Sequence, residues 1–203
     1  MENIMRENDH LRQEGYRIAV AVLAGGQSKR MGRPKDCVVI SGDGRTFLEK
    51  ICDEADDAAG SCISGRYLSV RKDQDIARSG YINVTDKHEG IGPMGGLFSV
   101  LLRAKEDGFD AVLALACDLI GYEHSEIIDI CRHYRGETVL FARTEGQFLQ
   151  PLASIYSVKA LPEFENLIEK KDYRLRDLKD IISDVGYYDS CHDGYYENCN
   201  SLD

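Results

Sequence analysis

The sequence predicts an α/β fold, a three-layer α/β/α sandwich built on a mostly parallel, Rossmann-like sheet. Short runs of apolar and β-branched residues alternate along the chain with segments whose apolar residues recur at helical spacing. One run, residues 111–117, is apolar throughout, which is typical of a central strand covered on both faces. Strands that alternate with helices in this way favour parallel pairing with helices on both sides of the sheet. In such sheets the ligand lies beyond the carboxyl ends of the strands.

The elements in the first half of the chain follow from local patterns. Residues 17–23 form an apolar run that Gly-Gly follows at once, which indicates a buried strand entering a loop. Residues 46–58 carry apolar side chains at helical spacing, and Thr46 with Glu49 three residues later has the spacing of a capping box. Short strand candidates follow at residues 61–64 and 81–85.

The second half of the chain continues the alternation. Helices are predicted at residues 95–104, 125–134, 158–171 and 175–182. Strands are predicted at residues 111–117, 138–142, 152–156 and 185–188. In the second of these helices, the spacing predicts that Ile127, Ile128 and Cys131 face the core.

The composition excludes several classes of partner. The 203 residues suit one domain, residues 17–203, behind a polar N-terminal arm, residues 1–16. A net charge of -10 argues against nucleic-acid binding, which needs clustered cations, but it permits an anionic small molecule. The sequence lacks both a run of about 18 apolar residues, as a membrane-spanning helix needs, and the apolar core of a signal peptide. Seven cysteines without a CxxC pair predict reduced thiols, so we expect a cytoplasmic protein.

The first loop with unusual chemistry spans residues 23–35. It begins with Leu23, Ala24, Gly25 and Gly26, whose small side chains let the backbone approach a ligand and present N–H groups to anionic oxygens. Four cations follow, Lys29, Arg30, Arg33 and Lys35. N–H donors followed by cations suit a triphosphate. A Gly-Gly pair alone more often only makes a turn, and this loop contains neither the P-loop motif nor the Rossmann glycine fingerprint.

A second glycine-rich loop follows the predicted strand at residues 81–85. Gly92, Gly95 and Gly96 again allow close backbone approach, and Pro93 stiffens the turn before a helix. Taken alone, such a loop is equally an ordinary connection between a strand and a helix.

The third loop begins with Asp118, directly after the apolar run at residues 111–117. A carboxylate at a strand end beside a phosphate-binding loop is a natural Mg²⁺ ligand, because Mg²⁺ favours hard oxygen donors and substrate phosphates. The alternative is that Asp118 only caps a helix or makes a turn.

The string LAGGxSxRMGxxK at residues 23–35 resembles the signature of nucleotidyltransferases with a GlmU-like nucleotide-binding fold. In its Gly-Gly form it is most similar to the molybdenum cofactor guanylyltransferases. The resemblance implies one nucleotidyltransferase domain with the fold of the nucleotide-diphospho-sugar transferases. It implies transfer of GMP from GTP to a phosphate-terminated molybdopterin, with Mg²⁺ as cofactor and pyrophosphate as the leaving group. Proteins of molybdenum cofactor assembly become candidate partners, and the oligomeric state stays open.

The resemblance also implies roles for individual residues. Those that would hold the nucleotide are Leu23, Ala24, Gly25, Gly26, Lys35, Asp86, Gly92, Pro93, Gly95 and Gly96. Those that would act on the reacting phosphates are Arg30, Lys35 and Asp118, with Asp118 as the magnesium ligand. Residues 92–96 match the family's GPLAG-type segment, and Cys117 with Asp118 matches its Cys-Asp pair at the strand end.

Weaker matches extend the resemblance into the acceptor half. The residues that would meet the acceptor are Gln150, Arg174, Arg176, Asn198 and Asn200. Gln150 stands where the family has His, and residues 119–120 stand where it has Thr-Pro or Met-Pro. The family's Asn after the second strand is also missing, since residues 64–66 are Ser-Gly-Arg.

Two other functions stay open. The same fold could transfer a cytidylyl group to this cofactor, or a nucleotidyl group to a sugar or cobinamide phosphate. The altered acceptor half also permits a non-catalytic protein that only binds a nucleotide.

Overall fold

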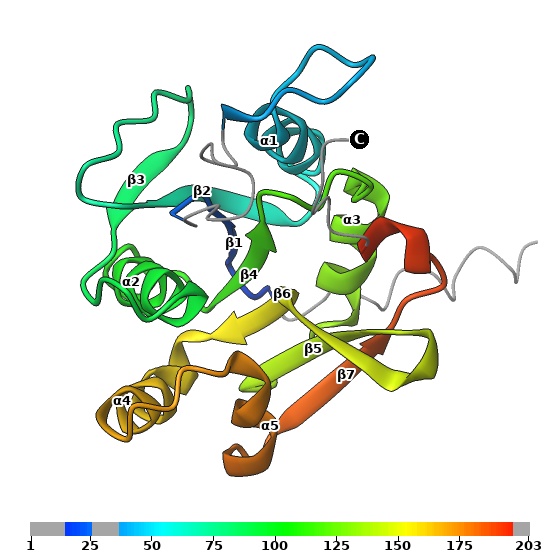
Figure 1. The fold of residues 1–203 in the computed structure, drawn as a ribbon. Helices are drawn as coiled ribbons and strands as arrows, with labels where there is room; N and C mark the ends of the chain where they lie inside the picture. Colours follow the sequence, from blue (N-terminus) through cyan, green and yellow to red (C-terminus); the bar gives the residue numbers. More distant parts are fainter. Residues whose placement is uncertain (1–14, 26–36, 197–203) are drawn as a thin grey trace, which may run out of the picture.

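The strands of the protein form one mixed sheet (Figure 1). The computed structural model describes residues 15–25 and 37–196. Its seven strands follow the order β3-β2-β1-β4-β6-β5-β7. Their bounds are β1 Ile18–Leu23, β2 Ile63–Val70, β3 Ile82–Thr85, β4 Ala111–Ala116, β5 Val139–Thr144, β6 Phe148–Ser157 and β7 Val185–Asp189. Within the described residues, six strands share one direction, and β6 runs antiparallel to β4 and β5.

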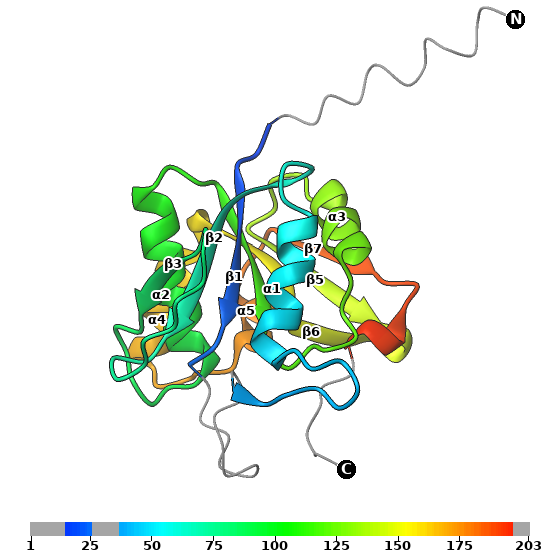
Figure 2. The same ribbon diagram turned by 90° about the horizontal axis from the view of Figure 1, so that it is seen from above.

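Helices cover both faces of the sheet, so the predicted three-layer arrangement is confirmed (Figures 1 and 2). One face carries α1 (Phe47–Asp57) and α3 (His124–His133), and the other carries α2 (Pro93–Glu106), α4 (Leu161–Glu169) and α5 (Leu178–Ile181). Single 3-10 turns lie at η2 (Glu145–Gln147), η3 (Val158–Ala160), η4 (Leu175–Asp177) and η5 (Asp193–Tyr196). The turn η4 and the short α5 replace the single helix predicted over residues 175–182. None of the helices in the described residues is long and apolar enough to cross a membrane.

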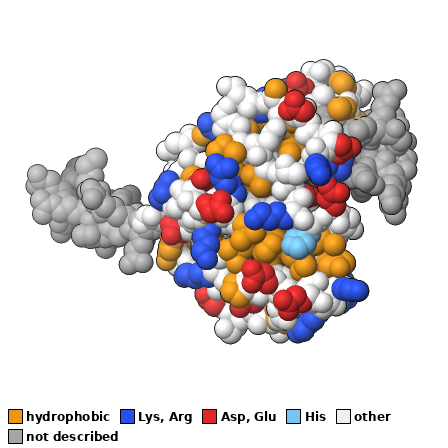
Figure 3. All heavy atoms as spheres, turned by 90° about the vertical axis from the view of Figure 1, so that its left-hand side faces the viewer, with side chains coloured by type: hydrophobic (Ala, Val, Ile, Leu, Met, Phe, Trp, Pro, Cys, Tyr) orange, Lys and Arg blue, Asp and Glu red, His pale blue; other side chains and the backbone are white. Residues whose placement is uncertain are grey.

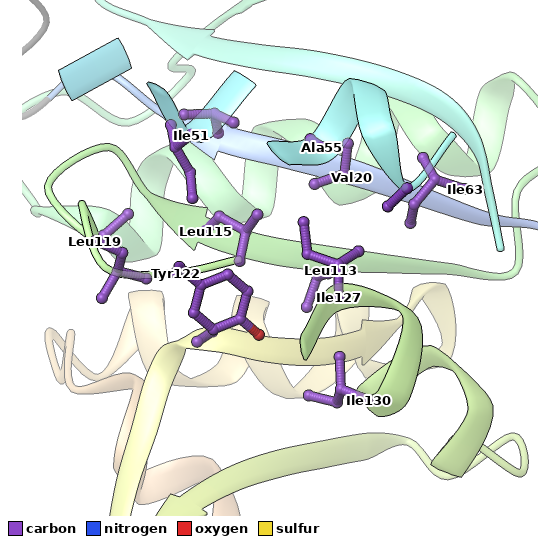
Figure 4. Packing of buried hydrophobic residues seen from close by; sticks show 14 of the residues in the cluster. Val20, Ile51, Ala55, Ile63, Leu113, Leu115, Leu119, Tyr122, Ile127 and Ile130 are labelled. Atoms are coloured by element: carbon purple, nitrogen blue, oxygen red, sulfur yellow. The ribbon is translucent and has the colours of Figure 1, made fainter. Parts of the chain in front are cut away.

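The central strands are buried on both faces, which explains their continuous apolar runs. Alternate side chains along a strand point to opposite faces, so Val20 and Leu113 belong to the core beneath α1 and α3, whereas Ala21 belongs to the core beneath α2. In Figure 4 Val20 lies beside Ala55 of α1, and Leu113 lies beside Ile127 of α3. Packing of this kind holds the strand ends, and therefore the loops that leave them, in fixed relative positions.

The helix α1 begins with the predicted capping box. The backbone N–H of Glu49 donates to Thr46 Oγ1 (3.1 Å), and the backbone N–H of Thr46 donates to Glu49 Oε2 (2.7 Å). Two N–H groups that lack intrahelical partners are thereby satisfied, and the prediction is confirmed.

The strand β2 is longer than predicted. It runs over Ile63–Val70, whereas the sequence indicated residues 61–64. Its polar residues Ser64, Arg66 and Ser69 interrupt the apolar pattern on which the prediction depended. The correction matters for the site, because it moves the carboxyl end of this strand from residue 64 to residue 70.

Two further predictions about helices were wrong in detail. The helix predicted over residues 158–171 begins at Leu161, because Pro162 falls in its first turn, where a missing N–H is tolerated. On α3 the predicted Ile127 and Cys131 are buried, but so is Ile130, which was not predicted, whereas Ile128 is only partly buried.

The carboxyl ends of β1, β2, β3 and β4 meet at one edge of the sheet, because these four strands are parallel. In Figure 2 the arrow of β1 points toward this edge, at the lower side of the view. The antiparallel β6 starts at the same edge. All three loops singled out in the sequence leave the sheet there, as predicted.

Candidate active site

The loops after β1 and β3 meet at Asp86. A methyl group built on Gly25 would lie 3.5 Å from Asp86 Oδ2, and one built on Gly96 would lie 3.1 Å from Asp86 Oδ1. The backbone N–H of Ala24 donates to the carbonyl oxygen of Ser69 at the end of β2 (3.0 Å), which holds the first loop in place. Two predicted nucleotide-binding residues, Gly25 of the first loop and Gly96 of α2, therefore lie against the carboxylate of a third, Asp86.

Asp86 is half-buried and accepts a hydrogen bond from Ser69 Oγ to its Oδ1 (2.8 Å). Burial raises the pKa of the Asp86 carboxyl above its ordinary value, and the charge of Glu89 acts in the same direction. The hydrogen bond from Ser69 and the charge of Arg71 oppose this rise. The folded protein thus holds a partly desolvated acceptor group that a ligand with N–H donors could satisfy.

Asp86→Asn is expected to weaken nucleotide binding by roughly tenfold without lowering stability near neutral pH. Because the pKa of Asp86 is higher in the folded than in the unfolded state, the wild type loses stability as pH rises through the unfolded value of about 3.9 toward the folded one. The Asn variant lacks this loss, so its Tm should match or exceed that of the wild type near pH 7, and the difference should vanish at acidic pH. Melts across pH and nucleotide titrations measure both effects. The exposed acid Asp75, changed to Asn, is the matched control.

The second glycine loop is packed against the N-terminus of α2. Gly92 is the residue before the helix and has a φ of 69°, a conformation that favours glycine, and Pro93 occupies the first turn. A methyl group on Gly95 would lie 2.4 Å from the carbonyl oxygen of His88, so only glycine fits this approach. Ser99 Oγ donates to the Gly95 carbonyl oxygen and accepts from the backbone N–H of Lys87, both at 2.8 Å.

The first turn of α2 contains no acidic residue, so no side chain of that turn offsets the positive end of the helix dipole. This end of a 14-residue helix lies beside Gly96 and Asp86 at the carboxyl edge. Backbone N–H groups at such a terminus favour an anionic ligand. The role of residues 92–96 toward a nucleotide stays a prediction.

Asp118 lies at the same edge as Gly25. β1 and β4 pair in register up to Leu23 and Ala116, so Gly25 and Asp118 each stand two residues beyond the last pair. Asp118 is 6% exposed and follows the buried Cys117. The strand therefore presents a carboxylate at the edge that carries both glycine loops.

Two residues at this edge were not predicted from the sequence. Arg71 Nη1 donates to the carbonyl oxygen of Gly25 (3.3 Å), and Gln74 Nε2 donates to the carbonyl oxygen of Ala24 (3.3 Å). Both belong to the segment that leaves β2 after Val70. The comparison of residues 64–66 with the family's Asn was wrong, because these residues lie in the amino-terminal half of β2. The sequence did contain a signal that the strand continues to Val70, namely the mostly apolar stretch just before Arg71.

Only some of the predicted acceptor-binding residues lie within the described part of the chain. Leu115 pairs with Ala153, so Gln150, three residues earlier on the antiparallel β6, lies toward the edge where Asp118 emerges. Gln150 Nε2 donates to Thr144 Oγ1 (3.3 Å) on the neighbouring strand. The contact of Gln150 with an acceptor stays a prediction.

The two predicted acceptor arginines are exposed. Arg174 forms ion pairs with Asp172 (2.9 Å) and Asp177 (2.6 Å) of its own turn, so its charge is neutralised locally. Arg176 lies in η4, a turn that contacts β6. Their roles toward an acceptor also stay predictions. Outside the described residues lie Gly26, Lys29, Arg30, Arg33, Lys35, Asn198 and Asn200.

The C-terminal turn η5 packs against the segment that follows Asp118. Tyr195 Oη donates to Glu123 Oε2 (2.8 Å), and Tyr196 Oη donates to the buried Glu126 Oε1 (2.7 Å). A methyl group on Gly121 would lie 2.9 Å from the carbonyl oxygen of Gly194. These contacts therefore hold η5 against the segment that connects β4 to α3.

One group of acidic and histidine side chains in the described residues has the spacing of a metal site. Its members are Glu54 and Asp57 of α1 and His124 of α3, whose ligand atoms lie within 4.8 Å of one another. Glu54 is already bonded to Lys50 and accepts from the backbone N–H of His124 (2.8 Å). The group does not include Asp118, the predicted magnesium ligand.

Charge on the described surface is mixed. On the face shown in Figure 3, Lys and Arg side chains are interspersed with Asp and Glu side chains. Such a distribution differs from the continuous basic stripe that phosphate-backbone binding needs.

The order and directions of the strands, with glycine loops gathered at one edge, define the class of protein: it is a nucleotidyltransferase. The family described as MobA-like NTP transferase domain matches residues 20–185, and the chain belongs to this family.

Relatives of this chain support the same class. "Probable molybdenum cofactor guanylyltransferase" of Aquifex aeolicus (strain VF5) is 32% identical over 169 residues, which cover 82% of this chain and 75% of the relative. The structure of molybdopterin-guanine dinucleotide biosynthesis protein A from Archaeoglobus fulgidus has a TM-score of 0.71 at 19% identity and covers 90% of this chain and 92% of that one. The structure of 4-diphosphocytidyl-2C-methyl-D-erythritol synthase from Anaerococcus prevotii has a TM-score of 0.67 at 14% identity, with coverage of 93% and 92%. Both structures share the fold.

Proposed function

We propose that this protein transfers GMP from GTP to the terminal phosphate of a molybdopterin-type acceptor, with release of pyrophosphate, in molybdenum cofactor biosynthesis. The relative from Aquifex aeolicus, named as a probable molybdenum cofactor guanylyltransferase, supports this reaction. The further support comes from the chemistry of the site.

The observation that carries the proposal is the half-buried carboxylate of Asp86 between Gly25 and Gly96. Guanine presents two adjacent N–H donors, N1–H and the 2-amino group, which match the two oxygens of a carboxylate. Adenine and cytosine present a donor beside an acceptor, and an ionised carboxylate can satisfy only the donor. The two glycines let the backbone of the first loop and of α2 approach this carboxylate closely. These features favour GTP over the other nucleotides.

The donor set at the phosphate end fits Mg²⁺. In proteins Mg²⁺ is bound by one or two carboxylates together with substrate phosphates, and Asp118 supplies such a carboxylate at this edge. When bound, the ion would neutralise charge on the phosphate oxygens. Arg30 and Lys35 would add positive charge to the α-phosphate and the leaving pyrophosphate.

In this reaction the main contribution of the protein is to position the two substrates. The acceptor phosphate attacks the α-phosphorus in line with the departing pyrophosphate, so the rate depends on holding the two substrates in that geometry. The N-terminus of α2 and the backbone of residues 23–26 would hold the nucleotide, and the loop after β4 would face the acceptor. Gln150 lies toward that loop on β6.

GTP with Mg²⁺ is expected to raise the Tm of the protein more than ATP, CTP or UTP does. A ligand at about 100 times its Kd stabilises the folded state by about 2.7 kcal/mol, which a thermal melt resolves. Incubation with molybdopterin, molybdate and an equal mixture of GTP and CTP should then yield a product whose mass carries GMP. Addition of CMP would replace the proposal with cytidylyl transfer, and binding of GTP without any product would favour the non-catalytic alternative.

We also propose that the protein acts in the cytoplasm beside other proteins of molybdenum cofactor assembly. The support is the cysteine content of the sequence, because seven cysteines without a CxxC pair are typical of a reducing compartment.

A further inference from the structure

A pocket of about 240 Å³ lies at the amino edge of the sheet, opposite the candidate active site. It is open to solvent at the turn between α1 and β2. Its lining includes Tyr16, Ser61, Cys62, Cys131 and Tyr134. Two of the six described cysteines therefore share one opening, although they are 69 residues apart in the sequence.

The two thiols of this pocket are adjacent. Cys62 Sγ lies 3.9 Å from the carbonyl oxygen of Ile127, and Cys131 stands one helical turn beyond Ile127 on α3. The thiols of Cys62 and Cys131 are hydrogen-bonded to each other. Cys62 is half-buried and opens to the pocket, whereas Cys131 is only 2% exposed and lies behind it.

The surroundings make the two sulfurs chemically unequal. The hydrogen bond from Cys131 lowers the pKa of the Cys62 thiol, and the positive charge of Arg132 acts in the same direction, while burial opposes both. The same hydrogen bond and burial raise the pKa of Cys131. For comparison, burial raises the pKa of the unpaired Cys52 to about 12. The half-buried Cys62 sulfur, whose thiol pKa is lowered, thus lies beside the more deeply buried Cys131 sulfur, whose thiol pKa is raised.

We propose that Cys62 and Cys131 form a thiol–disulfide exchange site that reacts with small-molecule disulfides. The Cys62 thiolate attacks one sulfur of the small disulfide, forms a mixed disulfide and releases one thiolate. Cys131 then loses its proton and attacks the Cys62 sulfur, which forms the Cys62–Cys131 disulfide and expels the second thiolate. The two protons lost by the cysteines end on the two released thiols, so the protein is oxidised by two electrons and the small disulfide is reduced.

The test uses the full-length protein, with glutathione disulfide as the probe. Differential alkylation followed by peptide mass spectrometry measures each cysteine over time. We expect Cys62 to react at least about twofold faster than the exposed Cys191, because the neighbouring Cys131 thiol and the charge of Arg132 lower the pKa of the Cys62 thiol. We also expect the Cys62–Cys131 cross-linked peptide as the end product.

The variants separate the two steps. Cys131→Ser should stop the reaction at a mixed disulfide on Cys62, and Cys62→Ser should leave Cys131 reduced. Cys191→Ser is the matched control and should leave the cross-link unchanged. If Cys62 reacted no faster than Cys191, or if wild-type Cys62 kept glutathione while Cys131 stayed reduced, the exchange site would be excluded. Circular dichroism of each variant shows whether it has folded, and alkylation of the wild type by iodoacetamide tests the reactivity of Cys62 without any substitution.

Discussion

Asp118→Asn is expected to reduce pyrophosphate release by roughly a thousandfold, with the fold intact. The substitution keeps the size of the side chain and removes the charge, so it weakens the hold on a divalent cation at the end of β4. Asp118 is 6% exposed and lies at the same edge of the sheet as Gly25, two residues beyond the last pair of β1 and β4. The measurement is the steady-state rate of pyrophosphate release as a function of Mg²⁺ concentration.

A control variant tests the second candidate metal site, the group on α1 and α3 that does not include Asp118. Asp57→Asn removes one member of the Glu54, Asp57 and His124 group on α1 and α3, and it should leave the rate unchanged. Activity that survives in Asp118→Asn but is lost in Asp57→Asn would move the metal site to that group. The Tm of both variants shows whether either substitution disturbs folding.

Gly96→Ala is expected to weaken GTP binding by roughly tenfold or more, about 1.4 kcal/mol of binding free energy for each factor of ten. The added methyl group would lie 2.3 Å from Ser69 Oγ and 3.1 Å from Asp86 Oδ1, so the Ser69–Asp86 pair has to move. Displacing this pair moves the carboxylate that we propose binds the base. Isothermal titration with GTP measures the effect.

Two further variants show whether the effect acts through this pair. Gly194→Ala adds a methyl group where nothing lies within 4 Å, and it should bind GTP as the wild type does. Ser69→Ala combined with Gly96→Ala removes the closest contact, so the double variant should bind GTP better than Gly96→Ala alone. A double variant as weak as the sum of the two single variants would mean that Gly96 acts by another route.

The nucleotide half of the site could be predicted from the sequence because its signals are local. Gly25, Gly96 and Asp118 each follow an apolar strand or a glycine-rich turn directly, and parallel strands bring their carboxyl ends to one edge. The convergence of Gly25 and Gly96 on Asp86 follows from that topology. The capping box of α1 was predictable for the same reason, since both of its residues lie within one helical turn.

The other contacts depend on tertiary structure that no local pattern reveals. Arg71 and Gln74 were missed because β2 carries polar residues along its length, so its true end at Val70 was hidden. The neutralisation of Arg174 by Asp172 and Asp177 depends on the conformation of a short turn. An arginine in the sequence indicates a positive charge, but the sequence does not show which group that charge will contact.

The reversed direction of β6 has a consequence for how such a protein can change its second substrate. The pairing of β1 with β4 brings Gly25 and Asp118 to the same edge of the sheet, and neither strand depends on the length of the hairpin between β5 and β6. Insertions or deletions in that hairpin can therefore reshape the wall beside Gln150 without moving the triphosphate half. A family built on this sheet can diversify its acceptors while its donor chemistry stays the same.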